Sequence, residues 1–534
     1  MLIKLILAVA ICFPMLAFPQ LSIAWASPSY IVNGVLTDES TISPNNDVKQ
    51  ISNHNEWYNR YTNYPSGYTF LYPRHMIVDV SLSAVRTVFA DETTKIEIYH
   101  DNFSGTETDA HSYINYGNQF LNNTADHTVA LDTTFWDSGY QVHLLKWERR
   151  KLARVINDKN YYVSAEIIRS PSEVYTVFIK SSLPIENELD IINSFTFIDK
   201  QGTAGIYKKP TASASQLNKE TAAFYNQYFS PGSKLTWGLF EPSAPETFSY
   251  LDPLETAMDH TFPILLRYQS LEENAPIRGL AKAYEKGRTI ELTLQTVNPG
   301  LVDALKARSD NDNAHIVYEI LDGNYDDYLH TYASRLKTFG HPVLFRLNNE
   351  MNGDWCWYSA YYTAKDTDLY IALWKYIHTI FAEEGVDNVL WVWNPHDLSR
   401  PDFKWNHYLT YYPGDEFVDI IGMTGYNTGT YFPGESWREF DEIYAPLYRD
   451  YNALFSKPLM ITEFASNSVG GDKAAWLHTM FNSLDNYPNI KVAVWWSGID
   501  YDAKGYPGRI YLIDESDEYL KIFQERLPKK AISF

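Results

Sequence analysis

The sequence predicts an α/β protein: a closed (β/α)8 barrel preceded by a smaller α+β domain with an antiparallel sheet. Two observations predict this arrangement. In the second half of the 534-residue chain, short apolar runs alternate with longer segments of helical spacing, as in repeated βα units. In the first half, segments rich in β-branched and aromatic residues follow one another with few long helices between them.

Eight apolar runs define the predicted barrel strands. They cover residues 235–240, 262–268, 289–295, 342–347, 389–393, 418–424, 458–463 and 492–496. Helical segments between them include residues 324–339, 366–384 and 472–486. An open doubly wound sheet is the rival fold, but its first strand is usually followed by a glycine-rich phosphate loop. Residues 237–242 read Trp-Gly-Leu-Phe-Glu-Pro, which is no such loop, so the barrel is favoured.

The first half is predicted to hold one antiparallel sheet with flanking helices. Strands are expected at 67–72, 76–82, 95–99, 129–132, 141–147, 161–168 and 173–179, and helices at 106–121 and 189–192. This order, which closes on Ser194 to Phe197, resembles small PsbP-like domains. An accessory or spacer role is the plainer interpretation. Contact with carbohydrate or with the cell envelope is the alternative.

The predicted boundaries follow changes in composition. Residues 1–26 resemble a secretory signal peptide, with Lys4, a short apolar segment and cleavage after Ala26, so an extracellular product is expected. The accessory domain then covers 27–199, a linker 200–233 and the barrel 234–534. Within the linker, Asn218 to Phe229 could form a helix that caps the barrel.

Composition excludes several classes of function. The net charge of −22 argues against nucleic-acid binding, which needs a basic face. No long apolar run follows the signal, so no membrane insertion is expected. The 14 His residues are scattered and lack metal-ligand spacing, so neither a catalytic metal nor another cofactor is expected. The acidic segment 309–313 is read as a solvated loop rather than a calcium site.

One stretch combines a buried strand with a polar end. Residues 342–358 begin as an apolar run and then change to Asn348, Asn349 and Glu350, followed by three aromatic rings. In a parallel barrel, catalytic groups lie at the C-terminal ends of the strands. Glu350 is therefore a candidate catalytic acid. His396 with Asp397, after the fifth strand, has a loop role as the plainer interpretation and contact with substrate as the alternative.

A second carboxylate occupies the matching place in the seventh unit. Glu463 ends the run 458–463, so two carboxylates are expected at one barrel mouth. Such a pair can flank a glycosidic bond, and retaining hydrolysis needs the two groups about 5–5.5 Å apart. The acid must stay protonated, whereas the nucleophile needs donors such as Tyr426 or Arg346 to stay ionised.

The second half resembles glycoside hydrolase family 26, within a clan that places its glutamates after strands 4 and 7. The resemblance rests on Phe345–Arg346, Glu350–Trp355, Trp391–Trp393, Gly425–Tyr426 and Ile461–Phe464. It implies that Glu350 is the acid/base, that Glu463 is the nucleophile and that Tyr426 hydrogen-bonds the nucleophile. Trp355 and Trp496 would line the subsites beside the scissile bond. Members are mostly endo-β-1,4-mannanases, with some mixed-linkage β-glucanases and β-1,3-xylanases.

One position departs from the family. The residue before the acid/base is usually His, whereas this chain has Asn349, the residue common in the wider clan, where it bonds the sugar 2-hydroxyl. Mannose and glucose differ at that hydroxyl. Arg346, Asn349, Tyr426 and the platforms Trp355, Trp393 and Trp496 are the expected substrate-binding residues, since sugar faces pack on aromatic rings.

Three functions follow from these residues. The first is a secreted, retaining endo-β-1,4-mannanase (mannan endo-1,4-β-mannosidase) acting on a polysaccharide. The second is an endo-hydrolase of mixed-linkage β-glucan or of a microbial exopolysaccharide. The third is an inactive barrel that only binds carbohydrate, against which the presence of both glutamates, Arg346 and Tyr426 argues.

Overall fold

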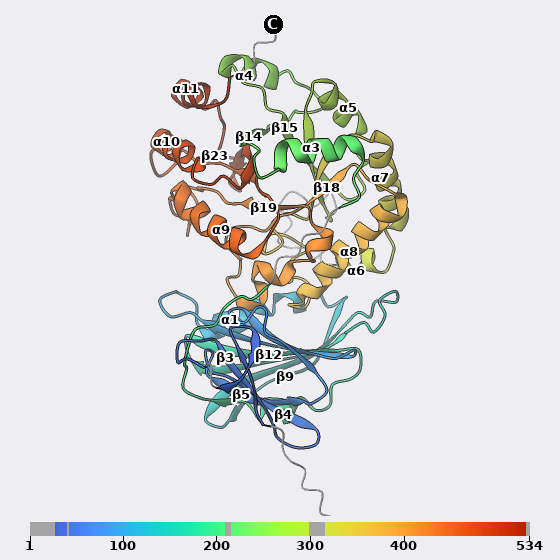
Figure 1. Cartoon of the computed structure of the whole chain (residues 1–534), viewed down its shortest axis with the longest axis vertical. Coiled ribbons are helices and arrows are strands. Elements are labelled where there is room, and N and C mark those ends of the chain that lie inside the picture. The colour runs from blue at the N-terminus through green and yellow to red at the C-terminus, as the bar shows by residue number, and fades with distance from the viewer. Residues whose placement is uncertain (1–26, 40–41, 209–214, 298–314, 530–534) are drawn as a thin grey trace, which may run out of the picture.

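The computed structural model describes residues 27–39, 42–208, 215–297 and 315–529. The N-terminal strands lie beside one flank of a barrel that the rest of the chain forms, next to helices α6 and α8 (Figure 1). The expected signal peptide (1–26) and the acidic segment 309–313 lie outside the described residues. In the part of the chain that is described, no helix combines the length and apolar character that crossing a bilayer requires.

The barrel consists of eight strands that pair in chain order and close on themselves. The strands are β14 (Thr236–Phe240), β15 (Ile264–Ser270), β16 (Thr289–Gln295), β17 (Val343–Leu347), β18 (Val389–Trp393), β19 (Ile420–Thr424), β20 (Leu459–Phe464) and β21 (Ile490–Trp496). All pairs are parallel, and β14 pairs with β21 to close the ring. The predicted (β/α)8 barrel is therefore confirmed, with its eight strands in the predicted order.

Helices surround the barrel between the strands. They are α4 (Leu251–Met258), α5 (Ile277–Glu285), α6 (Ile316–Leu321), α7 (Asp326–Phe339), α8 (Thr367–Glu384), α9 (Phe440–Leu454), α10 (Lys473–Leu484) and α11 (Asp517–Arg526). Local sequence sets their ends. Asp366 caps α8 by accepting a hydrogen bond from the backbone N–H of Asp368, and Gly385 ends the helix at φ 69°. The short helices η6 (Lys404–Asn406), η7 (Tyr408–Tyr411) and η8 (Asp415–Phe417) follow β18, and the small hairpin β22 (Ile499–Tyr501)–β23 (Pro507–Ile510) follows β21.

Apolar side chains fill the lower barrel, and helix α3 (Lys219–Phe229) packs against them. The inward layer contains Leu344, Leu390 and Met460, together with Phe229 from α3. The predicted helix within the linker therefore forms, and it contacts the barrel interior. Residues 209–214 of that linker lie outside the described residues.

The N-terminal part holds two antiparallel sheets where one was expected. One has the order β13-β5-β4-β3-β1-β2 and the other β6-β7-β8-β12-β11-β10-β9. The strands are β1 (Ser29–Val32), β2 (Val35–Thr37), β3 (Val48–Asn53), β4 (Tyr58–Asn63), β5 (Tyr68–Pro73), β6 (Ile77–Asp79), β7 (Arg86–Ala90), β8 (Thr94–Asn102), β9 (His127–Asp137), β10 (Tyr140–Arg149), β11 (Tyr161–Ser170), β12 (Glu173–Ser181) and β13 (Thr196–Phe197). The helices are α1 (Ala110–Gly117), η2 (Gln119–Asn122) and α2 (Glu188–Ile192). The antiparallel architecture is confirmed, and the PsbP-like resemblance stays a prediction.

The seven-stranded sheet is covered on both faces. One face packs on the other sheet through a core that includes Phe70, Phe89 and Val177. The opposite face, with Trp147 and Phe178, belongs to the same continuous core as the barrel helices. Alternation along each strand places these two sets of side chains on opposite faces. The N-terminal part and the barrel therefore share a buried apolar interface.

Buried charges cross this interface. The Nζ of Lys180 on β12 lies 2.5 Å from the carboxylate of Asp366, 2.6 Å from Asp368 and 3.6 Å from Glu97. Lys180 has only 1% of its side chain exposed, and these carboxylates hold its pKa well above the ordinary value. Because Asp366 also caps α8, the start of a barrel helix depends on a cation from the N-terminal sheet.

We expect Lys180→Met to lower the melting temperature of the whole protein. The change leaves the buried carboxylate of Asp366 without its cation, which costs about 3–5 kcal/mol, whereas Glu97 and Asp368 keep Lys95 as a partner. Differential scanning calorimetry should show a single transition, shifted downward. Lys521→Met is the matched control, since Lys521 is 71% exposed on α11, and its effect should stay within about 0.5 kcal/mol. A melting temperature equal to that of the wild type would contradict a contribution from Lys180.

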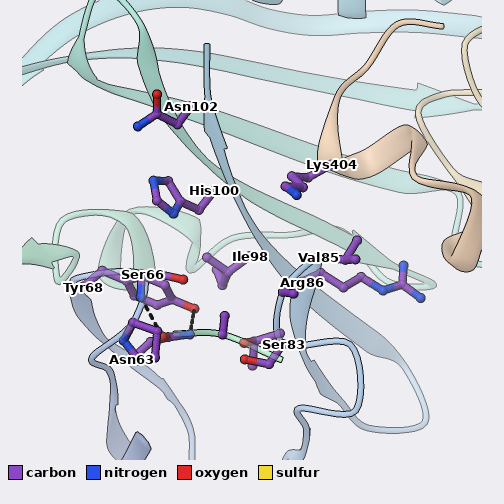
Figure 2. A pocket seen from close by; sticks show the side chains of 14 residues that line it. Asn63, Ser66, Tyr68, Ser83, Val85, Arg86, Ile98, His100, Asn102 and Lys404 are labelled. Carbon is purple, nitrogen blue, oxygen red and sulfur yellow. Dashed lines mark hydrogen bonds between the residues drawn. The ribbon is translucent and has the colours of Figure 1, made fainter. Parts of the chain in front are cut away.

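A polar pocket of about 310 Å³ opens where the N-terminal sheets meet a barrel loop. Asn63 and Ser66 line it from one sheet, His100 from the other and Lys404 from the barrel (Figure 2). His100 lies 2.7 Å from Glu173, and neither carboxylate of the predicted catalytic pair lines the pocket. This pocket is therefore separate from the site described next.

Candidate active site

Glu350 lies in the turn after β17, three residues beyond Leu347, at the C-terminal end of the barrel. Its backbone has φ 55° and that of Asn348 has φ 50°, a left-handed conformation that costs energy for a glutamate. The side chain of Asn348 fixes the turn, because its Oδ1 accepts from the backbone N–H of Thr296 (2.8 Å) and its Nδ2 donates to Thr296 Oγ1 (2.9 Å). The turn thus carries local strain at a predicted catalytic residue.

The Glu350 carboxylate is hydrogen-bonded by the ring of Trp355 and lies close to the ring of His396. The Nε1 of Trp355 donates to Glu350 Oε2 over 2.9 Å, and His396 Nε2 lies 3.9 Å from Glu350 Oε1. The rings of Trp355 and His396 meet edge to face at 5.0 Å. Trp355 keeps 41% of its surface exposed, so this carboxylate lies beside an accessible aromatic face. The hypothesis that His396 lies at the site agrees with this geometry.

Glu463 lies near the end of β20, where the strand is irregular. Ile461 and Phe464 both belong to the outer core between the strands and helices, whereas Met460 belongs to the inner layer. Regular alternation would not place residues three apart on the same face. The register shift between Ile461 and Phe464 supplies the extra residue, and such a bulge can re-aim a side chain. Glu463 consequently points to the buried guanidinium of Arg346.

Arg346 links the strands that carry the two carboxylates. Its guanidinium donates to Glu463 Oε2 (3.2 Å), to Asn394 Oδ1 (3.1 Å) and to Thr293 Oγ1 (2.7 Å). The backbone N–H of Glu350 in turn donates to the carbonyl of Asn394 over 2.7 Å. Arg346 and Asn394 therefore connect the neighbourhoods of Glu350 and Glu463 at one end of the barrel.

A third carboxylate lies beneath this network. Glu291, on the inward face of β16, is fully buried, and its Oε1 lies 3.2 Å from Arg346 Nε. Burial raises the pKa of Glu291 to about 8, although the Arg346 charge acts in the opposite direction. Sequence reasoning missed Glu291. A glutamate inside the otherwise apolar run 289–295 was the signal that could have found it.

Burial also changes the acidity of Glu463. Desolvation raises the pKa of its carboxyl to about 8, and the negative charge of Asp500 acts in the same direction. Asp500 lies on β22 and is paired with Arg509 at 2.9 Å. The hydrogen bond from Arg346 favours the ionised form of Glu463.

Aromatic rings line the opposite side of the mouth. Trp496 is half-buried at the end of β21 and stacks on Phe240 at 5.1 Å, while Tyr268 meets Phe240 edge to face at 5.3 Å. Tyr426 lies 6.4 Å from the Trp496 ring. Trp495, the neighbour of Trp496, is fully buried on the outer face of the barrel, as alternation predicts.

Three expected roles need correction. Trp393 is fully buried and packs on Tyr412 (4.9 Å) outside the barrel, so it cannot contact a substrate. Arg346 is also fully buried, so it holds Glu463 instead of touching a sugar. Tyr426 was expected to donate to the nucleophile, but among the hydrogen bonds of the described residues none joins Tyr426 to Glu463. Arg346 donates to the Glu463 carboxylate instead.

Asn349 is held with its amide oriented. Its Oδ1 accepts from Gln295 Nε2 (3.0 Å) and from the Tyr358 hydroxyl (3.4 Å), while its backbone carbonyl accepts from Tyr358 at 2.7 Å. This leaves the Nδ2 amine as the part of the side chain that can donate to another molecule. Asn349 is 4% exposed, directly before Glu350.

Fold and site define a (β/α)8-barrel protein with paired acidic groups at its C-terminal mouth. Residues 301–498 match the sequence profile described as glycosyl hydrolase family 26. This part of the chain, which holds both Glu350 and Glu463, is therefore similar to glycosyl hydrolase family 26, the family that the motifs around those two residues predict.

Relatives match parts of this chain. Endoglucanase H of Acetivibrio thermocellus is 37% identical over 183 residues, which are 33% of this chain and 20% of that protein. A mannan endo-1,4-beta-mannosidase of Bacillus subtilis is 43% identical over 103 residues, 18% of this chain and 27% of that protein. The matches thus span between a fifth and about a quarter of the length of these relatives. A GH26 β-mannanase structure from Bacteroides ovatus is 17% identical, covers 58% of this chain and 92% of that chain, and has a TM-score of 0.43.

Proposed function

We propose that the protein is a retaining endo-glycoside hydrolase that cleaves β-linked polysaccharide, with β-1,4-mannan as the first candidate substrate. The observation that carries the proposal is the hydrogen-bond network of Arg346. Arg346 binds Glu463 on β20 and also Asn394, whose carbonyl accepts from the backbone N–H of Glu350 after β17. Two carboxylates joined in this way at the barrel mouth, beside exposed rings, suit cleavage of a sugar chain.

The reaction proceeds in two displacements. Glu463 attacks the anomeric carbon and forms a glycosyl-enzyme ester, while the protonated carboxyl of Glu350 gives its proton to the leaving oxygen. Glu350, now ionised, then removes a proton from water, which attacks the same carbon and releases Glu463. Arg346 holds the Glu463 carboxylate through the 3.2 Å hydrogen bond, and Trp355 orients Glu350.

The accessibility and the hydrogen bonds of the two carboxylates support this division of roles, whereas the burial of Glu463 confines its ionised, nucleophilic form to pH values toward about 8. Glu463 is 3% exposed and receives a charged donor, as a nucleophile requires. Glu350 is more accessible, with 13% of its side chain exposed, so water can reach it in the second step. Asn349 supplies an amide donor beside Glu350 for a sugar hydroxyl.

The pH dependence should report the acidity of Glu463. Because its raised pKa keeps the carboxyl protonated at lower pH, kcat/KM should rise as the pH increases toward about 8. Asp500→Asn removes a charge that raises this pKa, so the acidic limb should move to lower pH by roughly half a unit. Asp450→Asn, on the outer helix α9, is the control and should leave the limb in place. An acidic limb that moves upward in Asp500→Asn would contradict the argument.

Assays on a panel of polysaccharides identify which polymer is the substrate. Release of reducing sugar from β-1,4-mannans is expected, with β-anomeric products at early times by NMR. Mixed-linkage β-glucan is the second candidate, because a relative matched over 183 residues is named an endoglucanase and because Asn349 replaces the family histidine. Hydrolysis of β-glucan with none of mannan would select the second candidate. Binding without hydrolysis of any mannan, glucan, xylan or exopolysaccharide would select the inactive carbohydrate-binding barrel.

Export and the accessory role are also proposals. The charged start and apolar segment of residues 1–26 support cleavage after Ala26 and secretion. The boundaries 27–199, 200–233 and 234–534 are proposed as the accessory domain, the linker and the hydrolase domain. N-terminal sequencing of the protein recovered from culture medium tests the cleavage position, and Ser27 is the expected first residue.

A further inference from the structure

The N-terminal part reaches the loop that carries the predicted acid. Helix α1 packs on the barrel through aromatic contacts, with Tyr113 4.5 Å from Phe403 and Tyr116 5.1 Å from Tyr361, ring centroid to ring centroid. The backbone N–H of Lys404 also donates to Asp101 of β8 over 2.8 Å. These contacts hold α1 and β8 against the segment after β18, and they hold Tyr116, near the end of α1, against the loop after β17.

Tyr116 is connected to Glu350 through two neighbours in that loop. Its hydroxyl donates a short hydrogen bond to the carboxylate of Asp354. Asp354 precedes Trp355, whose Nε1 donates to Glu350 over 2.9 Å. The segment is fixed from the barrel side as well, because the Tyr362 hydroxyl donates to the Asp354 carbonyl over 2.6 Å. Tyr116 is thus held beside the barrel mouth although it lies more than two hundred positions earlier in the chain.

The ring of Tyr116 remains accessible. It is 40% exposed, close to the 41% of Trp355, while its hydroxyl and one side are fixed by Asp354 and Tyr361. A ring held in this way loses little conformational entropy when a ligand packs on it. Apolar sugar faces pack on such rings.

We propose that Tyr116 is a sugar-binding residue of the substrate cleft, supplied by the N-terminal part. This inference rests on the proposed function. Glu350 protonates the leaving oxygen, so the residues beyond Trp355 on its side face the leaving-group part of the polysaccharide. Tyr116 then binds that part of the chain, toward its reducing end, and favours long substrates over short ones.

Kinetics on two substrates test the proposal. The first is the polymer that the panel selects, and the second is an aryl β-glycoside of the same sugar, whose leaving group is too short to pass Trp355. In Tyr116→Ala, we expect the ratio of kcat/KM for the polymer to that for the aryl glycoside to fall about tenfold. Tyr116→Phe keeps the ring and loses the hydrogen bonds of the hydroxyl, including the one to Asp354, so the ratio should stay near that of the wild type.

The control and the possible results distinguish a sugar-binding role of Tyr116 from a purely structural role. Tyr284→Ala is the matched control, because Tyr284 is 39% exposed but lies on α5, stacked on His341 away from the mouth. A parallel fall of both rates in Tyr116→Ala, at an unchanged ratio, would assign a purely structural role and overturn the proposal. A ratio that falls equally in Tyr116→Phe would also overturn it. If the wild-type protein hydrolyses neither substrate, both the proposed function and the role of Tyr116 fail.

Discussion

Glu463→Gly should reduce turnover of the polymer by at least about 10⁴-fold, because the variant lacks the nucleophile that forms the glycosyl-enzyme ester. The fold should survive, since the change removes a carboxylate whose burial raises its pKa to about 8. Circular dichroism and the melting temperature check the fold, and reducing-sugar release checks the activity.

Chemical rescue makes this test specific to the nucleophile. Azide can occupy the space left by Glu463, attack the anomeric carbon of an activated aryl β-glycoside and yield an α-glycosyl azide with release of the phenolate. The matched control is Glu384→Gly at the exposed end of α8, which should retain activity. Undiminished turnover in Glu463→Gly, or rescue that gives a β-azide, would refute the assignment.

Glu350→Ala should give a different pattern, because an acid/base is needed most when the leaving group is poor. We expect about a 10³-fold or larger loss on the polymer, whose leaving group is a sugar hydroxyl. Formation of the ester from a dinitrophenyl glycoside needs no proton, so it should stay fast and produce a burst of phenolate. Stopped-flow absorbance measures that burst.

The second half of the Glu350 test concerns the product. Azide should accelerate breakdown of the ester in Glu350→Ala and give a β-glycosyl azide, with the opposite configuration to that expected in Glu463→Gly. Trp355→Phe is the companion variant, since it removes the donor to Glu350 Oε2 but keeps a ring. Equal losses on the polymer and the dinitrophenyl glycoside in Glu350→Ala would contradict an acid/base role.

The barrel could be predicted because its signal is local. Strands β16 and β18 have the bounds expected from the sequence, 289–295 and 389–393, since short apolar runs between helices leave little choice of register. The N-terminal sheets gave a weaker signal. Strand β4 reads Tyr-Asn-Arg-Tyr-Thr-Asn, in which polar residues and tyrosines hide the alternation. It was missed for that reason, so the predicted strand at 67–72, which is β5, was not assigned to a separate sheet.

The sequence allowed us to predict which residues lie at the site, but not in every case which way their side chains point. Simple alternation from Met460 would have turned Glu463 outward, and only the bulge in β20 returns it to the mouth. Trp393 was wrongly expected to contact substrate, because the alternation of side chains along a strand defines two faces without showing which face points into the barrel. Its neighbour Val392 faces the interior, so Trp393 does not. Arg346 was expected both as a donor to the nucleophile and as a substrate-binding residue, and only the first expectation agrees with the structure. Its complete burial is hard to foresee, because the cost of a buried charge depends on partners from other strands.

The shared interface has a practical consequence for the design of shorter fragments. A recombinant piece that starts near residue 234 would keep all eight barrel strands. It would also expose to water the apolar residues that Trp147 and Phe178 now cover, and it would leave Asp366 without its lysine. Such a truncation should therefore aggregate or be recovered in poor yield, whereas a boundary placed before β1 retains the covering sheet.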